Sequence, residues 1–205
     1  QAKDIAVDDS GNVYVTGSSE ASTPNGAKFD YATIKYNSAG VMQWVARYNG
    51  PGDDLDEATS IAVDSMGNVY VTGFSRSGST GAHNDFATVK YNTAGIQQWV
   101  RRYNGGGSDI AVKISIDING DILVGGWSTR SATGADFTVI KYNPNGDSLW
   151  VRIYDSGGSD NRYDYAVAIE LDNTGNVYLV GSVGLNISSA PDWATVKWDA
   201  QGNFV

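Results

Sequence analysis

The sequence predicts an all-β fold made of repeated, four-stranded antiparallel sheets. Three observations support this prediction: one segment recurs four times, each copy holds four short runs rich in β-branched and aromatic residues, and no stretch keeps a 3.6-residue apolar period. The chain has 205 residues, of which 25 are glycine and only 18% are charged. Such a composition is typical of many tight turns between aromatic-rich strands.

The repeat is marked by a segment that reads IAVDDSGNVYVTG in its first copy, from Ile5 to Gly17. Three further copies follow at spacings of 56, 53 and 55 residues, and the aspartates that mark the four copies are Asp8, Asp64, Asp117 and Asp172. A second segment, DYATIKYNSAG in the first copy, and then a W-x-x-x-Y pattern follow in fixed order. The repeats run approximately over 1–56, 57–109, 110–164 and 165–205, about 55 residues each, and the last one is incomplete.

Each repeat predicts four strands, which in the first copy cover residues 5–8, 12–16, 31–36 and 43–48. Asp-x-x-Gly-Asn joins the first two strands and Tyr-Asn-x-x-Gly joins the last two. Both sequences suit tight hairpins, because glycine adopts positive φ and Asx side chains bond nearby backbone amides. Sheets that are apolar on both faces need a neighbour on each side, so we expect four-stranded blades of a β-propeller, forming one region over 1–205.

The repeated segments resemble the SBBP repeat, a bacterial β-propeller family named for a seven-bladed propeller. The residues that carry the resemblance are I-A-V-D-x-x-G-N-V-Y-V-T-G and D-[YFW]-A-T-[IV]-K-Y-N-x-x-G, in four copies that cover nearly the whole chain. The third copy departs most, at 136–140, and the fourth has Trp198 and Asp199 in place of Tyr-Asn. The resemblance implies a propeller on a secreted or surface-attached bacterial protein, with no common catalytic activity.

The register of the repeat predicts that these copies are a stretch of a longer polypeptide. The tryptophan of the last fourth strand would follow Val205, and the aspartate that precedes each first strand would fall before Gln1. We therefore expect the remaining blades of the same polypeptide, or a homo-oligomer, as partners that complete the sheets.

Composition and charge exclude several classes of function. The formal net charge of −9 disfavours binding to nucleic acid and to anionic membranes, and no apolar run is long enough for membrane insertion. The absence of cysteine excludes disulfides and cysteine nucleophiles, and the single histidine, His83, disfavours Ser-His-Asp triads and multi-histidine zinc sites. We expect no catalytic residue.

Ligand binding is expected on the face that carries the loops of variable length. These loops cover 18–29, 74–84, 127–135 and 182–191 within the repeats, and 49–57 between the first two. Phe74 and Trp127 stand where the other copies have serine, and an aromatic ring among polar residues suits stacking on a sugar. Alternatively, each ring packs against the next blade. The other tryptophans hold repeat positions and are expected in the core or between blades: Trp44, Trp99, Trp150, Trp193 and Trp198.

Aspartates on the same face suggest ligand or metal contacts. Asp53 and Asp54 open an acidic run, and Asp160 lies in a second one. Oxygen-rich loops of this kind can hold Ca²⁺, although the spacing matches no twelve-residue calcium loop. The aspartates that precede each first strand are candidate metal ligands or, alternatively, caps for backbone amides at the start of that strand: Asp56, Asp109 and Asp164. The repeated lysines are expected to pair with aspartates: Lys35, Lys90, Lys141 and Lys197.

These features together predict a non-catalytic binding or scaffold module, extracellular or at the cell surface, with a glycan or another surface protein as ligand. One alternative is a structural building block of an extracellular assembly. A further alternative is a polysaccharide-active enzyme that uses Asp53 and Asp54.

Overall fold

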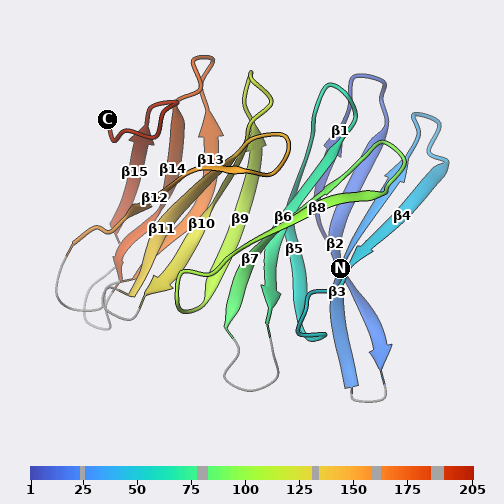
Figure 1. Cartoon of the computed structure of the whole chain (residues 1–205), viewed down its shortest axis with the longest axis horizontal. Helices are drawn as coiled ribbons and strands as arrows, with labels where there is room; N and C mark the ends of the chain where they lie inside the picture. Colours follow the sequence, from blue (N-terminus) through green and yellow to red (C-terminus); the bar gives the residue numbers. More distant parts are fainter. Residues whose placement is uncertain (24–25, 78–82, 131–133, 158–162, 186–191) are drawn as a thin grey trace. The chain divides into compact units, whose positions relative to one another are not determined.

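The computed structural model describes residues 1–23, 26–77, 83–130, 134–157, 163–185 and 192–205. These residues form fifteen β-strands and no helix, which confirms the all-β prediction. They fall into two compact units, Gln1–Tyr103 and Asn104–Val205, and each unit holds two antiparallel sheets (Figure 1). Within the described ranges, no helix has the length and apolar character needed to cross a membrane.

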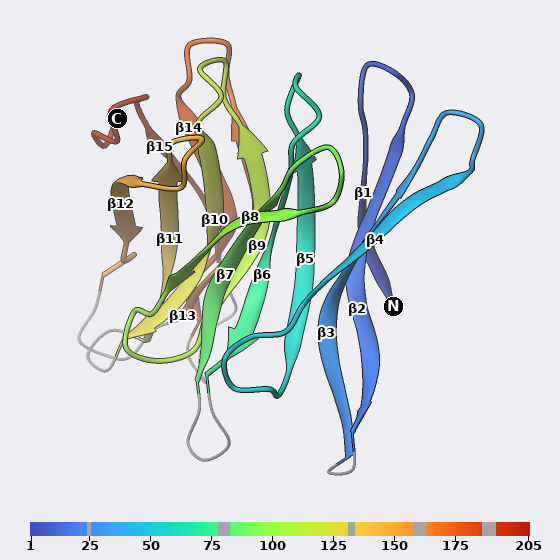
Figure 2. The same cartoon turned by 45° about the vertical axis from the view of Figure 1, so that its right-hand side comes forward.

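The first unit contains one four-stranded sheet for each of the first two repeats. The first sheet has the order β1 (Ala2–Val7), β2 (Val13–Thr23), β3 (Gly26–Tyr36), β4 (Met42–Tyr48). The second has the order β5 (Asp56–Val63), β6 (Val69–Arg76), β7 (Asn84–Tyr91), β8 (Gln97–Tyr103). Strand β5 lies against β1, β2 and β3, so the two sheets pack face to face (Figure 2).

The second unit repeats this arrangement. Its four-stranded sheet is made of β9 (Asp109–Ile116), β10 (Ile122–Arg130), β11 (Gly134–Tyr142) and β12 (Ser148–Tyr154). The other sheet has three described strands, β13 (Tyr163–Leu171), β14 (Val177–Leu185) and β15 (Asp192–Trp198), and Phe204 forms one bridge to Trp198. Strand β13 lies against β9, β10 and β11.

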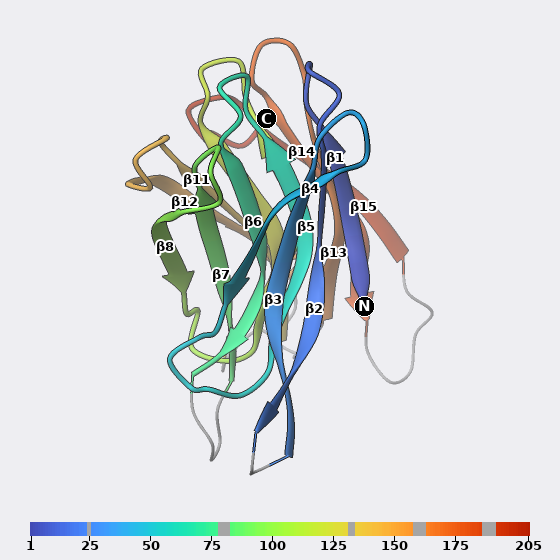
Figure 3. The ribbon, with the colours of Figure 1, turned by 90° about the vertical axis from the view of Figure 1, so that its right-hand side faces the viewer.

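The predicted loop at 18–29 is mostly a long hairpin, so the loop prediction was wrong there. The pairing of β2 with β3 continues through Ser18–Tyr31, Ser19–Asp30 and Glu20–Phe29 (Figure 3). Residues 18–23 contain no glycine or proline, so nothing interrupts the ladder. The loop prediction was also wrong at the described ends of the other three loops, because 74–76 continue β6, 127–130 continue β10 and 182–185 continue β14. Within these three loops, residues 78–82, 131–133 and 186–191 lie outside the described part of the chain.

Side-chain caps build the Asp-x-x-Gly turns as predicted. Asp8 Oδ1 accepts hydrogen bonds from the backbone N–H groups of Ser10 and Asn12 at 3.0 and 2.9 Å, while Gly11 adopts a φ of 75°. Asp8 Oδ2 accepts a hydrogen bond from the hydroxyl of Tyr14 at 2.8 Å. Burial raises the pKa of Asp8, but the hydrogen bonds from Asn12 and Tyr14 outweigh it and hold that pKa below its usual value. The same amide bonds recur at Asp64, Asp117 and Asp172.

Gly73 on β6, at a second glycine position that recurs in the repeats, lies against a β-bulge in the neighbouring strand β5. The β5–β6 register shifts between Ala58 and Ser60, and this shift brings the Glu57 carbonyl over Gly73. A Cβ on Gly73 would lie 2.0 Å from that oxygen. Glycine is therefore required here by close backbone approach, not by its freedom of φ.

One apolar cluster joins the two sheets of the first unit. The first sheet contributes Tyr14, Tyr31 and Tyr48, and Trp44 packs against them. The second sheet contributes Ala58, Ile61, Val69, Val71, Ala87, Val89 and Tyr91. The predicted packing role of Trp44 is thus confirmed, and its indole N–H donates a hydrogen bond to the carbonyl of Thr93 at 3.0 Å.

The second unit has an equivalent cluster. Its four-stranded sheet contributes Leu123, Phe137 and Val139, with Trp150 packed against them, and its three-stranded sheet contributes Ala166, Ile169, Val177, Leu179, Val196 and Trp198. The predictions for Trp150 and Trp198 are confirmed. The prediction for Trp193 was wrong, because its side chain is 75% exposed. Tyr31 and Phe137 hold the same repeat position as Trp193, but the next sheet of their unit covers their rings.

Candidate functional site

The aspartates that the sequence placed before the first strands lie at the beginning of those strands, where they are buried and cap backbone amides. Asp56 Oδ2 accepts a hydrogen bond from the backbone N–H of Gly50 at 2.5 Å. Asp109 Oδ2 accepts one from the backbone N–H of Gly105 at 2.7 Å. Asp164 accepts the Ser156 N–H at 2.8 Å. The capped amides belong to the loop that leads into the strand and not to the strand itself. These carboxylates therefore fasten the loops between sheets, which is a structural role.

Asp53 and Asp54 lie in the loop between the first two sheets, and each pairs with a cation. Asp53 is exposed, adopts a φ of 44° and accepts a hydrogen bond from the Lys28 amine at 2.7 Å. The bond from Lys28 lowers the pKa of Asp53. Asp54 lies 3.7 Å from the Arg76 guanidinium. Both carboxylates thus pair with a cation on a neighbouring strand, Lys28 on β3 and Arg76 on β6. Their predicted contact with a ligand remains a prediction.

Phe74 and Trp127, the two aromatic residues predicted to contact a ligand, are both half-buried. Phe74 on β6 pairs in register with Glu57 on one side and Phe86 on the other. Trp127 on β10 meets the ring of Tyr165 on β13 edge to face, with ring centroids 4.9 Å apart. Trp127 therefore packs against the next sheet of its unit, which is the alternative that the sequence left open for it.

Tyr163, Tyr165 and Trp127 form an aromatic stack that the sequence reasoning missed. Tyr163 lies parallel to Tyr165, with centroids 5.9 Å apart and an interplanar angle of 12°, and is 41% exposed. The outermost ring is therefore presented to solvent on a base of two packed rings. A signal for it was present: both tyrosines differ from the residues that other copies have at these positions, Leu55 and Ser108 for Tyr163, and Glu57 and Ile110 for Tyr165.

Asp136, Asp155 and Asp164 form an acidic group in the second unit. One carboxylate oxygen from each lies within 4.8 Å of the others; Asp136 and Asp164 are buried and Asp155 is exposed. Arg130 donates to Asp136 from Nε at 3.0 Å and from Nη2 at 2.8 Å, so a cation already balances part of this charge. Ca²⁺ takes six to eight oxygen ligands, and this group offers three. The sequence identified Asp164 but associated it with Asp160, which lies outside the described residues.

The arginine beside this acidic group comes from a different strand than in the other repeats. In the first two repeats the aspartate at this position pairs with an arginine on the fourth strand, Asp30 with Arg47 and Asp85 with Arg102. The third repeat has Ile153 at that position, and the charge comes from β10 instead. The repeated aspartate is thus paired with arginine in three sheets by two different routes.

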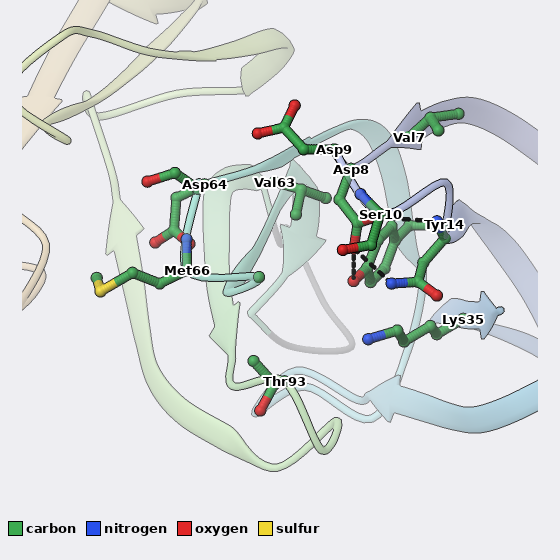
Figure 4. A pocket seen from close by; sticks show the side chains of 13 residues that line it. Val7, Asp8, Asp9, Ser10, Tyr14, Lys35, Val63, Asp64, Met66 and Thr93 are labelled. Atoms are coloured by element: carbon green, nitrogen blue, oxygen red, sulfur yellow. Dashed lines mark hydrogen bonds between the residues drawn. The ribbon is translucent and has the colours of Figure 1, made fainter. Parts of the chain in front are cut away.

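A pocket of about 350 Å³ lies between the hairpin turns of the first and second sheets (Figure 4). Its lining includes Tyr14 and Lys35 from the first sheet and Asp64, Met66 and Thr93 from the second. It is on the side of the short, uniform turns, not among the variable loops. Sequence reasoning missed it because the cavity forms only where two sheets meet.

The repeated lysines differ in their partners. Lys35 lies over the Tyr14 ring at 5.0 Å from its centroid, and Lys90 and Lys197 lie over Tyr70 and Tyr178 at 5.1 and 5.3 Å. Lys141 is buried and forms ion pairs with Asp117 at 2.8 Å and Asp121 at 3.2 Å. The predicted pairing with aspartate is therefore confirmed for Lys141, where Leu123 replaces the tyrosine of the other copies.

Comparisons with known proteins bear on the family and the fold. No curated protein matches the sequence. Among solved structures, a protein of unknown function from Bacteroides caccae is similar over 100% of this chain and 80% of its own, with a TM-score of 0.50 and 12% identity, a likeness that concerns the fold alone. A structure described as the eukaryotic initiation factor matches 100% of this chain and 54% of its own, with a TM-score of 0.45 and 10% identity. Residues 1–22 and 43–77 match the model of the SBBP family, described as a beta-propeller repeat. Residues 1–77 of the chain therefore contain the SBBP beta-propeller repeat.

Proposed function

We propose that this chain is the blade-forming part of a β-propeller that acts as a non-catalytic binding module, with a glycan as ligand. In line with the family resemblance, the proposal places the protein outside a bacterial cell or on its surface. The observation that carries it is the stack of Tyr163 on Tyr165 and Trp127, in which the outer ring is exposed.

The chemistry of the stack suits a sugar ring. A pyranose has an apolar face that stacks on an aromatic side chain and a polar edge that remains hydrated. Tyr165 and Trp127 hold the exposed ring in place, so little side-chain entropy is lost when a ligand binds. Trp127 supports the platform from beneath in this proposal and need not touch the ligand itself.

The repeated carboxylates support a non-catalytic role. The aspartates of the hairpin turns accept hydrogen bonds from backbone amides, and those at the beginning of β5, β9 and β13 cap the loops between sheets. Asp30, Asp85 and Asp136 pair with arginines. Each of these groups is thus engaged in holding the sheets and turns together.

The test is binding of soluble polysaccharides of different monosaccharide composition, measured by titration calorimetry with the 205-residue chain. Tyr163→Ala is expected to weaken binding at least about tenfold, because an aromatic anchor of an interface contributes on the order of 2 kcal/mol. Phe29→Ala is the matched control, since Phe29 is an aromatic residue of comparable exposure, 37%, in the other unit. Binding that Tyr163→Ala leaves unchanged, or no binding to any polysaccharide, would contradict the proposal.

A further inference from the structure

The contact between sheets uses the same two surfaces in both units. We define the trailing face of a sheet by the positions that Tyr14, Tyr31 and Trp44 hold in the first sheet. We define the leading face by the positions that Ile61, Val71 and Val89 hold in the second sheet. In the first unit, the trailing face of the first sheet packs on the leading face of the second.

In the second unit, the corresponding residues make the corresponding contact. Leu123, Phe137 and Trp150 form the trailing face, and the leading-face positions are Ile169, Leu179 and Val196. The side chains at the centre of these contacts are almost fully buried, with exposures of 4% for Ile61 and 1% for Ile169. Two independent examples therefore establish what each face packs against.

The leading face of the first sheet is exposed. Ile5 corresponds to Ile61 and Ile169 in the repeat, yet it is 62% exposed, and Val45 on β4 is 50% exposed. Val15, Ile34 and Val45 line a groove of about 280 Å³ on this sheet. This surface has the composition of a buried contact but is accessible to solvent.

The trailing face of the last sheet is exposed as well. Trp193 corresponds to Tyr31 and Phe137, which are 0% exposed, yet its own exposure is 75%. Val167 on β13 corresponds to Val112, which packs in the cluster of the second unit, and is 65% exposed. The described residues thus include an exposed leading face on the first sheet and an exposed trailing face on the last.

We infer that the trailing face of the last sheet docks on the leading face of the first sheet in a second copy of this chain. Trp193 of one copy then lies over Ile5, Ile34 and Val45 of the other, as Tyr31 lies over the second sheet within one copy. The two faces are different surfaces, so the contact is head-to-tail and either closes into a ring or continues as a chain of copies. This inference goes beyond the proposed glycan binding and does not depend on it.

The contact is tested by sedimentation velocity of the 205-residue chain over a range of concentrations. The mass is expected to rise above the 21.8 kDa of one copy. Trp193→Asp and Ile5→Asp are each expected to weaken association at least about tenfold, because each places a charge in an apolar contact. Both residues are exposed in the single copy, so circular dichroism should show unchanged folding. Ile118→Asp, at an 84% exposed turn residue outside both faces, is the control and should associate normally.

A mixture of the two face variants identifies the geometry. Trp193→Asp retains an intact leading face and Ile5→Asp an intact trailing face, so the mixture should form a one-to-one dimer and nothing larger. A chain that stays monomeric at all concentrations would overturn the inference. So would association that neither face variant weakens, or a mixture that remains monomeric while the unmodified chain associates.

Discussion

The hydroxyl of Tyr31 on β3 donates a hydrogen bond to the backbone carbonyl of Ala87 on β7, at 3.1 Å, and so links the first sheet to the second. The ring is fully buried, and burial raises the pKa of Tyr31 well above its usual value. Phenylalanine holds this position in the second and third repeats, so an aromatic ring without a hydroxyl is compatible with the packing of such a sheet. Tyr31→Phe should therefore lower the free energy of unfolding by only about 1 kcal/mol, the net value of one buried hydrogen bond. Tyr31→Ala should cost about 3–5 kcal/mol in the same urea titration, and equal losses for the two variants would show that the hydroxyl and not the ring dominates.

Gly73 tests the close approach of the bulged strand. Gly73→Ala places a Cβ 2.0 Å from the Glu57 carbonyl oxygen, so the backbone of β5 must shift. The expected loss of unfolding free energy exceeds about 3 kcal/mol. Gly40→Ala is the control: it has φ +75° with nothing within 4 Å of a Cβ, and should cost about 1–2 kcal/mol. A larger loss for Gly40→Ala would contradict this account of the repeated glycine.

Lys141 should matter more than the equivalent lysines. Lys141→Met leaves Asp117 buried without its cation and should cost about 3–5 kcal/mol. Lys35→Met removes a contact with the Tyr14 ring and should cost about 0.5–1 kcal/mol. Thermal denaturation of both variants makes the comparison, and adding Asp117→Asn to Lys141→Met should recover part of the loss. Equal costs for the two lysines would contradict the assignment of the buried ion pair.

Asp53, in the loop between the first two sheets, and Asp56, at the start of β5, should give opposite pH dependence. Burial raises the pKa of Asp56, so the folded state favours the protonated form of this carboxyl. Its stabilising contribution is greatest below the usual aspartate pKa and is lost as the pH rises through the raised value. Asp56→Asn should remove this loss, because asparagine remains neutral and still offers an oxygen to the Gly50 N–H.

Asp53 provides the matched comparison. The bond from Lys28 lowers the pKa of Asp53, so its contribution is present above the usual aspartate pKa and is lost as the pH falls through the lowered value. The unfolding free energy of the unmodified chain and of each variant, Asp53→Asn and Asp56→Asn, is measured from acid to neutral pH. The difference between the unmodified chain and the variant should rise with pH for Asp53→Asn and fall with pH for Asp56→Asn. Slopes of the same sign would show that one of the two assignments is wrong.

The sequence was informative wherever one repeat contains the whole interaction. The turn at Asp8 and the pairing of consecutive strands depend on residues close in the chain, and both were predictable. The long β2–β3 hairpin was not, because serine and glutamate are tolerated in strands as well as in loops. Exposure of Trp193 was also missed, since a repeat position predicts which side of the sheet a residue occupies but not whether another sheet covers that side.

The candidate sites were harder to predict because they combine residues from two sheets. Trp127 was singled out, but its partner Tyr165 comes from the next repeat, and the pocket beside Lys35 exists only between neighbouring turns. Asp164 was identified as a possible ligand, whereas its neighbours Asp136 and Asp155 come from the preceding repeat. Comparing each residue with its equivalents is informative for such sites, because both tyrosines of the stack depart from the repeat.

The order of strands has a consequence for how the protein folds during synthesis. In each sheet, every strand pairs with the one that precedes or follows it in the chain. Contacts within a sheet are therefore local, which favours rapid formation, and one sheet can assemble as soon as its own strands have left the ribosome. Within each unit, the second sheet then finds the first one already in place as a template for its apolar face, so the apolar surface that a unit exposes to aggregation during translation is limited to about one sheet at a time.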